Sequence, residues 1–152
     1  MNKLIKTLVM ISIVLSIAGC SASGEKFQEL EMRNDSALVY IYRPWQFTNG
    51  GGWPHVYVDG EKIGPLKNGG YIAKDITPGN HSIELRGDVF NFPNLVLELD
   101  AEDGQTYYAR MLSSVTDAAL IGSISYVSKG SSFHLVESSH AKTEIVELKY
   151  SQ

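Results

Sequence analysis

The most constraining feature of this sequence is the regular succession of short apolar segments and turn residues from Ser36 onward. Each segment is a few residues long and is followed by Gly, Asn, Asp or Pro, a rhythm that is typical of an all-β domain. In 37–42 both alternating sets of side chains are apolar, which predicts a central strand covered on both faces. The chain has 152 residues, 43% of them hydrophobic, which fits one compact domain and excludes general disorder.

Turn residues set the expected order of the strands. Asp59-Gly60 lies between two apolar segments, 55–59 and 62–66, and an Asp-Gly pair suits the positive φ angles of a tight hairpin turn. Pro78-Gly79-Asn80 reverses the chain a second time. Further strands are expected at 71–75, 81–86, 95–100, 105–112 and 132–136.

The C-terminal tail has the pattern of a short amphipathic helix. Ala141, Ile145 and Leu148 are spaced at i, i+4 and i+7, and they follow Ser138 and Ser139, which can cap a helix. A terminal strand through 143–148 is the alternative. Together the elements predict a two-layer antiparallel β-sandwich with one short C-terminal helix, which occupies 36–150.

Residues 1–19 have the composition of a bacterial lipoprotein signal peptide. Lys3 and Lys6 precede an apolar run at 8–17, which is too short for a transmembrane helix of about 20 residues. The following Ile17-Ala18-Gly19-Cys20 resembles the bacterial lipobox. By that resemblance Cys20 is the lipid attachment site and the first residue of the mature chain. The alternative is an ordinary signal peptide followed by a free cysteine.

The predicted anchor places the protein in the bacterial cell envelope. Ser21 stands where lipoproteins of enterobacterial type that are retained in the inner membrane have an aspartate, so we expect attachment to the outer membrane, facing the periplasm. Residues 20–35 mix Ser, Gly, Glu, Lys and Asn and predict a flexible tether. As a coil, this tether would hold the domain about 20 Å from the bilayer.

Several motifs in the domain resemble those of one family. They are the run 56–64, Asn68-Gly69-Gly70-Tyr71, 78–83, Tyr107-Tyr108 and 133–137. With them the chain resembles an uncharacterised family of bacterial lipoproteins, a domain of unknown function that is itself similar to PEGA-type β-sandwich modules. The resemblance covers most of 36–149. It implies a lipoprotein β-sandwich with no established catalytic activity.

Composition and motif searches exclude several kinds of activity. Acidic residues outnumber basic ones 17 to 13, and loss of the two leader lysines changes the formal net charge from −4 to −6, so no nucleic-acid partner is expected. The single cysteine excludes an internal disulfide, and the four histidines lack the close spacing of metal ligands. No Gly-x-Ser-x-Gly motif is present, and Glu98 and Asp100 are expected on an exposed strand face. We therefore assign no catalytic residue, metal or cofactor.

The segment 43–55 concentrates side chains that are common in binding sites. It contains both tryptophans, Trp45 and Trp53, together with Arg43 and His55. Aromatic rings anchor protein interfaces and stack on sugars, so these four residues are the candidate binding residues. The alternative is that the two tryptophans only close one end of the sandwich.

A second unusual segment, 113–128, contains an apolar run without polar alternation. We interpret it as a buried crossover strand, and the alternative is an exposed loop that contacts a partner or a membrane. The sequence as a whole predicts a non-enzymatic, membrane-anchored domain that binds an envelope protein. One alternative is a glycan-binding module, which would need Trp45 and Trp53 to be exposed and roughly coplanar. A hydrolase of envelope polymers is the other.

Overall fold

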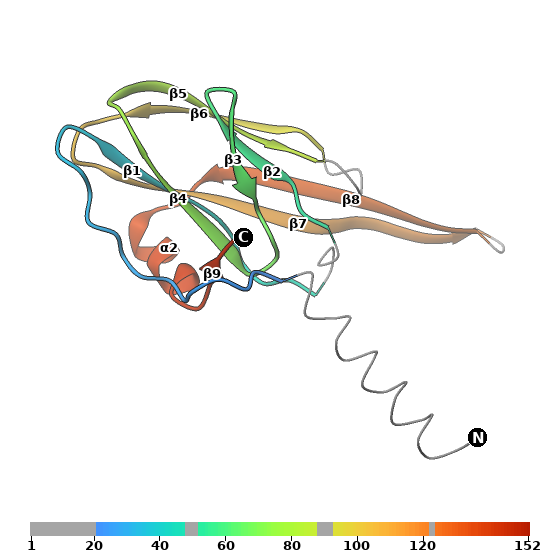
Figure 1. Ribbon diagram of the computed structural model, residues 1–152. Helices are drawn as coiled ribbons and strands as arrows, with labels where there is room; N and C mark the ends of the chain where they lie inside the picture. The colour runs from blue at the N-terminus through green and yellow to red at the C-terminus, as the bar shows by residue number, and fades with distance from the viewer. Residues whose placement is uncertain (1–20, 48–51, 88–92, 122–123) are drawn as a thin grey trace, which may run out of the picture.

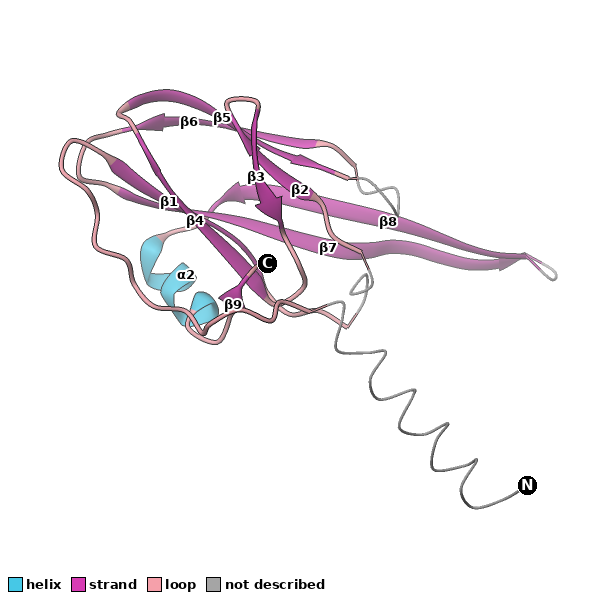
Figure 2. Ribbon diagram, viewed as in Figure 1, coloured by secondary structure: helices cyan, strands magenta, loops and turns pink. Residues whose placement is uncertain are grey.

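The computed structural model describes residues 21–47, 52–87, 93–121 and 124–152, and for 114–129 it describes the backbone alone. Strands dominate the described chain, and one helix lies near its C-terminus (Figure 2). The elements are β1 (Ala37–Arg43), β2 (His55–Val58), β3 (Glu61–Pro65), β4 (Gly70–Ile76), β5 (Gly79–Arg86), β6 (Leu95–Ala101), β7 (Thr106–Ile121), β8 (Ile124–Leu135), α2 (Ser138–Ile145) and β9 (Lys149–Tyr150).

The strands form two sheets, which confirms the predicted β-sandwich with a C-terminal helix. One sheet has the order β8-β7-β1-β4-β9 and the other β3-β2-β5-β6. The larger sheet is mixed, because β1 pairs with β7 and β4 pairs with β9 in parallel. The expectation of a purely antiparallel sandwich is wrong at these two pairs. The chain leaves this sheet after β4, forms the β5–β6 hairpin in the other sheet, and returns beside β1 in the same direction.

The main core lies between the two sheets. Ala37, Val39 and Ile41 on β1 join Val56 of β2 and Ile83 of β5 in one fully buried cluster. These three positions of β1 form one of the two alternating sets of the strand, because successive side chains point to opposite faces of a sheet. The predicted central strand is confirmed, since every residue of β1 is buried.

A second core covers the opposite face of the larger sheet. Leu38, Tyr40 and Tyr42 on β1 pack there with Ala141 and Ile145 of α2. Figure 1 shows α2 on the side of this sheet that faces away from β5 and β6. The molecule therefore has a third layer beyond the predicted two, and it explains why the outward set of β1 is apolar.

The helix forms as predicted, but its N-terminus is not capped by serine. The residue before the helix is Glu137, and no side chain donates or accepts a capping hydrogen bond there. The Ser139 hydroxyl donates to the Glu137 carboxylate at 2.9 Å instead. The prediction that a serine caps this helix is therefore wrong. The helix is stabilised by burial of its apolar residues, as is usual for short helices in proteins.

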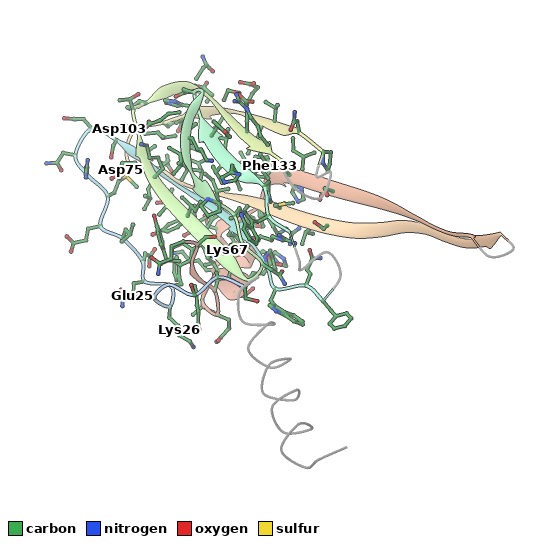
Figure 3. The ribbon with its side chains drawn as sticks, turned by 45° about the vertical axis from the view of Figure 1, so that its right-hand side comes forward. Glu25, Lys26, Lys67, Asp75, Asp103 and Phe133 are labelled. Atoms are coloured by element: carbon green, nitrogen blue, oxygen red, sulfur yellow. The ribbon has the colours of Figure 1, made fainter. Side chains whose placement is uncertain are left out.

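The segment 21–35 is packed against the domain, so the prediction of a flexible tether over 20–35 is wrong for this part. The Ala22 amide donates to the Asn68 carbonyl at 3.0 Å, and the Phe27 amide donates to the Leu148 carbonyl at 2.9 Å. The ring of Phe27 meets Tyr40 edge-on with a centroid distance of 5.3 Å. Its few apolar side chains supply the burial that offsets the entropy of ordering this segment. Figure 3 shows Glu25 and Lys26 pointing outward from it.

The β2–β3 hairpin confirms the Asp59-Gly60 turn. Asp59 has a φ of 50° and Gly60 a φ of 82°, the positive pair that the two-residue turn requires. The Asp59 carboxylate also accepts from the Ser82 amide at 2.9 Å and lies 2.7 Å from His81 Nδ1. The other ring nitrogen of His81 lies 2.7 Å from the Thr77 carbonyl. His81 is therefore a fully hydrogen-bonded rim histidine, as expected.

Beyond residue 113 the strands β7 and β8 continue as a long hairpin, which we call the arm. Their pairing runs from Ala109↔Leu135 to Ile121↔Ile124, whereas β1 pairs with β7 only as far as Arg110. Figure 1 shows the arm projecting well past the rest of the molecule. The apolar segment 113–128 is thus neither a crossover strand nor a loop. Ser113, at the base of the arm, is buried, and the structure describes only the backbone from 114 to 129.

Candidate functional site

The four candidate binding residues occupy different environments at one end of the sandwich. Arg43, the last residue of β1, is fully buried, and its Nη1 donates to the Gly52 carbonyl at 2.8 Å. Burial lowers the pKa of its guanidinium to about 10, which leaves it charged at neutral pH. Arg43 therefore links the end of β1 to Gly52, near the start of β2, by a buried hydrogen bond. As one of the candidate binding residues, Arg43 therefore offers no exposed side-chain surface in this structure.

The two tryptophans differ in exposure. Trp45 is 62% exposed. Trp53 is partly buried, and Lys67 Nζ lies 5.5 Å from the centroid of its ring. The condition for a sugar-stacking site, that both rings are exposed, is met by Trp45 and not by Trp53. His55 is also partly buried, at the start of β2, where it pairs with Pro65 and Arg86.

Phe47 is a surface residue that the sequence analysis missed. It is 88% exposed, two positions after Trp45. Gln46 between them is fixed from two sides. Its amide donates to Asn68 Oδ1 at 2.9 Å, and its carbonyl accepts from Asn68 Nδ2 at 2.8 Å. Its side-chain amide exchanges two further 3.0 Å hydrogen bonds with the backbone of Ser113.

These contacts make the exposure of Trp45 and Phe47 a property of the fold. Four hydrogen bonds fix Gln46 against the turn before β4 and against β7. Gln46 is partly buried, whereas the two aromatic residues that flank it are exposed. The sequence did contain a signal for Phe47, because it is a second aromatic residue separated from Trp45 only by the polar Gln46. The role of Asn68, by contrast, looked like that of an ordinary turn residue.

A groove of about 450 Å³ adjoins Trp45. The described chain begins in it, because Ser21 and Ala22 line it together with Trp45. The remaining lining residues are Pro44, Asn68, Gly69, Glu144, Glu147, Leu148 and Lys149. We call Trp45, Phe47 and this groove the aromatic face. It joins an exposed aromatic pair to the N-terminal start of the folded part.

A polar cluster between β7, β8 and α2 is the densest group of titratable side chains near this end. Arg110 Nη1 donates to Glu144 Oε1 at 2.9 Å, and the Tyr42 hydroxyl donates to Glu144 Oε2 at 2.6 Å. The Nε2 atoms of His134 and His140 each lie 3.3 Å from the Arg110 guanidinium. His140 Nε2 also lies 3.4 Å from Glu144 Oε1, so both the guanidinium and the carboxylate of the cluster are within its reach.

The cluster holds its carboxylate in the charged form. Partial burial alone would raise the pKa of Glu144, but hydrogen bonds from Tyr42 and Arg110 outweigh it, so the pKa is lowered. Burial and the hydrogen bond to Glu144 raise the pKa of the Tyr42 hydroxyl. A carboxylate already bound by a guanidinium and a phenol is a poor general base, so the cluster links α2 to the sheet. Within the described chain, no three His, Cys, Asp or Glu side chains are grouped as metal ligands.

The other expected polar surface agrees with the sequence. Glu98 and Asp100 on β6 are both exposed, and Glu98 accepts from the Ser82 hydroxyl at 3.1 Å. Cys20, the predicted lipid attachment site, lies outside the described residues. No helix in the described part is both long and apolar enough to cross a bilayer.

The fold and the site together define an all-β sandwich whose described surface shows an aromatic face and an internally paired polar cluster. Comparison with family models assigns residues 33–123 to the family described as "Protein of unknown function (DUF2846)". The chain belongs to this family. The match includes β1 through the outgoing strand of the arm and ends before β8 and α2. No curated protein and no solved structure matches the chain.

Proposed function

We propose that the protein is a lipid-anchored, non-enzymatic β-sandwich of the bacterial cell envelope that mediates protein interaction. The lipobox-like Ile17-Ala18-Gly19-Cys20 after a short apolar run supports the anchor. Ser21 in the following position supports attachment to the outer membrane on its periplasmic side. The Asp59-Gly60 hairpin and the turn at Pro78-Gly79 support a PEGA-like character of the domain.

The anchor is tested by removal of the cysteine. We expect Cys20→Ala to leave the precursor unprocessed or to release the protein from membranes. Membrane fractionation together with the mass of the mature chain gives the readout. A variant that stays in the membrane at the mass of the mature, lipid-bearing form would contradict the anchor. Ser23→Ala, an exposed change three residues away, is the matched control for processing.

The non-enzymatic part of the proposal rests on how the described polar groups are used. The carboxylate of Glu144 is bound by Tyr42 and Arg110, and both ring nitrogens of His81 have acceptors. Groups with such fixed partners position strands and the helix. General acid-base catalysis instead needs a group that can reach a substrate proton with a pKa near the working pH.

The projecting arm is the observation that carries the protein-binding part. Beyond Ser114↔Gly130 the strands of the arm pair with each other, and β1 no longer accompanies β7. The outer edges of such strands present unpaired N–H and C=O groups, and another protein can bind to these groups by adding a strand. The apolar composition of 118–121 and its return strand adds the side chains that interfaces favour.

A shortened arm tests this part directly. Because Ser114 pairs with Gly130, these two residues can be joined by Asn-Gly, which forms a two-residue hairpin turn and keeps the contact of Ser113 with Gln46.

Photo-crosslinking in cells tests the arm in the full-length protein. A photo-crosslinking residue at Thr116 is expected to capture a protein that the same residue at Val96 on β6, which is 56% exposed, does not capture.

The shortened protein is then compared with the full-length one. It should unfold at a similar urea concentration, because it keeps the whole pairing of β1 with β7, which ends at Arg110, and it should lose the partner in co-purification. Equal capture at Thr116 and Val96, or full capture by the shortened protein, would contradict binding through the arm.

A further inference from the structure

The aromatic face poses a physical question that the proposed function leaves open. Trp45 and Phe47 are 62% and 88% exposed, while Gln46 between them is fixed by four hydrogen bonds. The backbone that carries both rings is therefore held in place by the bonds of Gln46 to Asn68 and Ser113. A pair of large rings kept in water by the fold marks a surface that meets an apolar or interfacial environment.

The start of the described chain identifies this environment. The Ala22 amide donates to the Asn68 carbonyl, and Ser21 forms a β-bridge with Asn68. Both residues are therefore held next to Asn68, whose side chain also bonds to Gln46. Ser21, Ala22 and Trp45 line the same groove. Consecutive Cα atoms are about 3.8 Å apart. A lipid attached to Cys20 is therefore one residue away from Ser21, which lines the groove of the aromatic face.

We infer that the aromatic face lies on the bilayer, with Trp45 and Phe47 inserted at the interface beside the acyl chains of Cys20. This inference rests on the proposed lipid anchor. Tryptophan suits the position, because its ring is apolar while its N–H can bond to the headgroup region. The packing of 21–35 removes the spacer that would let the domain move away from the membrane. The domain thus has one fixed orientation on the lipid surface.

The charged residues that line the groove do not attract an anionic lipid. Glu144 and Glu147 line it together with Lys149, so the groove offers an anionic lipid no excess of positive charge. Binding by the rings should therefore be nearly independent of salt and of anionic lipid content, unlike binding by a basic surface.

The two tryptophans allow a matched experiment. Because the chain has one cysteine, the protein from Cys20 onward can be coupled at that thiol to a maleimide lipid in phosphatidylcholine vesicles. It contains every residue that the structure describes. In Trp53→Phe the only tryptophan is Trp45, and in Trp45→Phe it is the partly buried Trp53, so selective excitation of tryptophan reports one ring in each variant. Lipids brominated near the headgroup quench a ring that enters the interface.

We expect brominated lipids to quench Trp45 several-fold more strongly than Trp53, equally at low and high salt. Equal quenching of the two rings would overturn the inference. Because the lipid is attached chemically, this result is independent of processing in cells. Failure of the Cys20→Ala fractionation would contradict the anchor, whereas failure of the quenching would contradict the membrane orientation alone.

A protein occupant of the aromatic face is tested in cells. A photo-crosslinking residue at Phe47 should yield no discrete protein adduct if the ring faces lipid. A discrete adduct at Phe47, absent with the same residue at Leu135, which is 41% exposed on β8, would show that a protein covers this face. That result would overturn the inference.

Discussion

Phe27→Ala tests whether the segment 21–35 is a structural part of the domain. Phe27 packs edge-on against Tyr40 and Tyr71 at centroid distances of 5.3 Å and 5.2 Å. Truncation of a fully buried Phe costs about 3–5 kcal/mol. Because Phe27 is only partly buried, we expect a loss of roughly 2 kcal/mol, which includes the two ring contacts.

Urea unfolding of the chain from Ser21 onward measures this loss. With a slope of about 2 kcal/mol per molar, the midpoint should fall by about 1 M. Trypsin cleavage after Lys26 should become faster, because the bridge of Lys26 to Lys149 opens when the segment detaches. Gln28→Ala, an exposed neighbour, is the control. An unchanged midpoint in Phe27→Ala, with rapid cleavage of the wild type, would restore the flexible tether and refute our reasoning.

Three further predictions concern the loops and the hairpin. Gly60→Val should lower the free energy of unfolding by more than about 1 kcal/mol, because a β-branched residue tolerates the φ of 82° poorly. Gly60→Asn should lower it less. Equal urea midpoints of the two variants would contradict this prediction. Burial tends to lower the pKa of His81, but its hydrogen bonds to Asp59 and Thr77 outweigh it and the pKa is raised. This contribution to stability is complete below about pH 6.5 and is lost as pH rises through the folded-state pKa. The hydrogen bond with His81 lowers the pKa of Asp59, so its own contribution is lost as pH falls toward the acid range. His81→Gln should therefore flatten the urea midpoint between about pH 5.5 and pH 9, and a slope equal to that of wild type would contradict the pairing. Arg43→Met should preserve the fold but release Gly52, with a loss of about 1–3 kcal/mol and faster proteolysis between β1 and β2; unchanged proteolysis would show that Arg43 does not fix this connection.

The strands were predictable because their signals are local. The short, continuous apolar run at 37–42, bounded by polar residues, favours a buried strand, and Asp59-Gly60 favours a tight turn. The spacing of Ala141 and Ile145 similarly predicted α2. Each of these inferences uses residues within a few positions of one another, and each is confirmed by the structure.

The candidate site was only partly predictable. The sequence located the β1–β2 connection through Trp45, whose exposure is observed. It could not separate Trp45 from Trp53, since burial depends on what the rest of the fold places over each ring. The burial of Arg43 was unpredictable for the same reason: arginine is usually exposed, and Arg43 is buried where it donates to the Gly52 carbonyl.

The sequence by itself determined β1 to β6, the parts of β7 and β8 that lie within the domain, the hairpin turn, the helix and the expected place of the anchor. The continuation of β7 and β8 into the arm and the short strand β9 were not predicted. Only the tertiary structure decided that Phe27 is part of the second core, because its partners Tyr40, Tyr71 and the Leu148 carbonyl come from distant parts of the chain. A polar segment with few apolar residues has no local signal for packing. Its position is fixed by the free energy of long-range contacts, which exists only when the sheet and the helix have assembled.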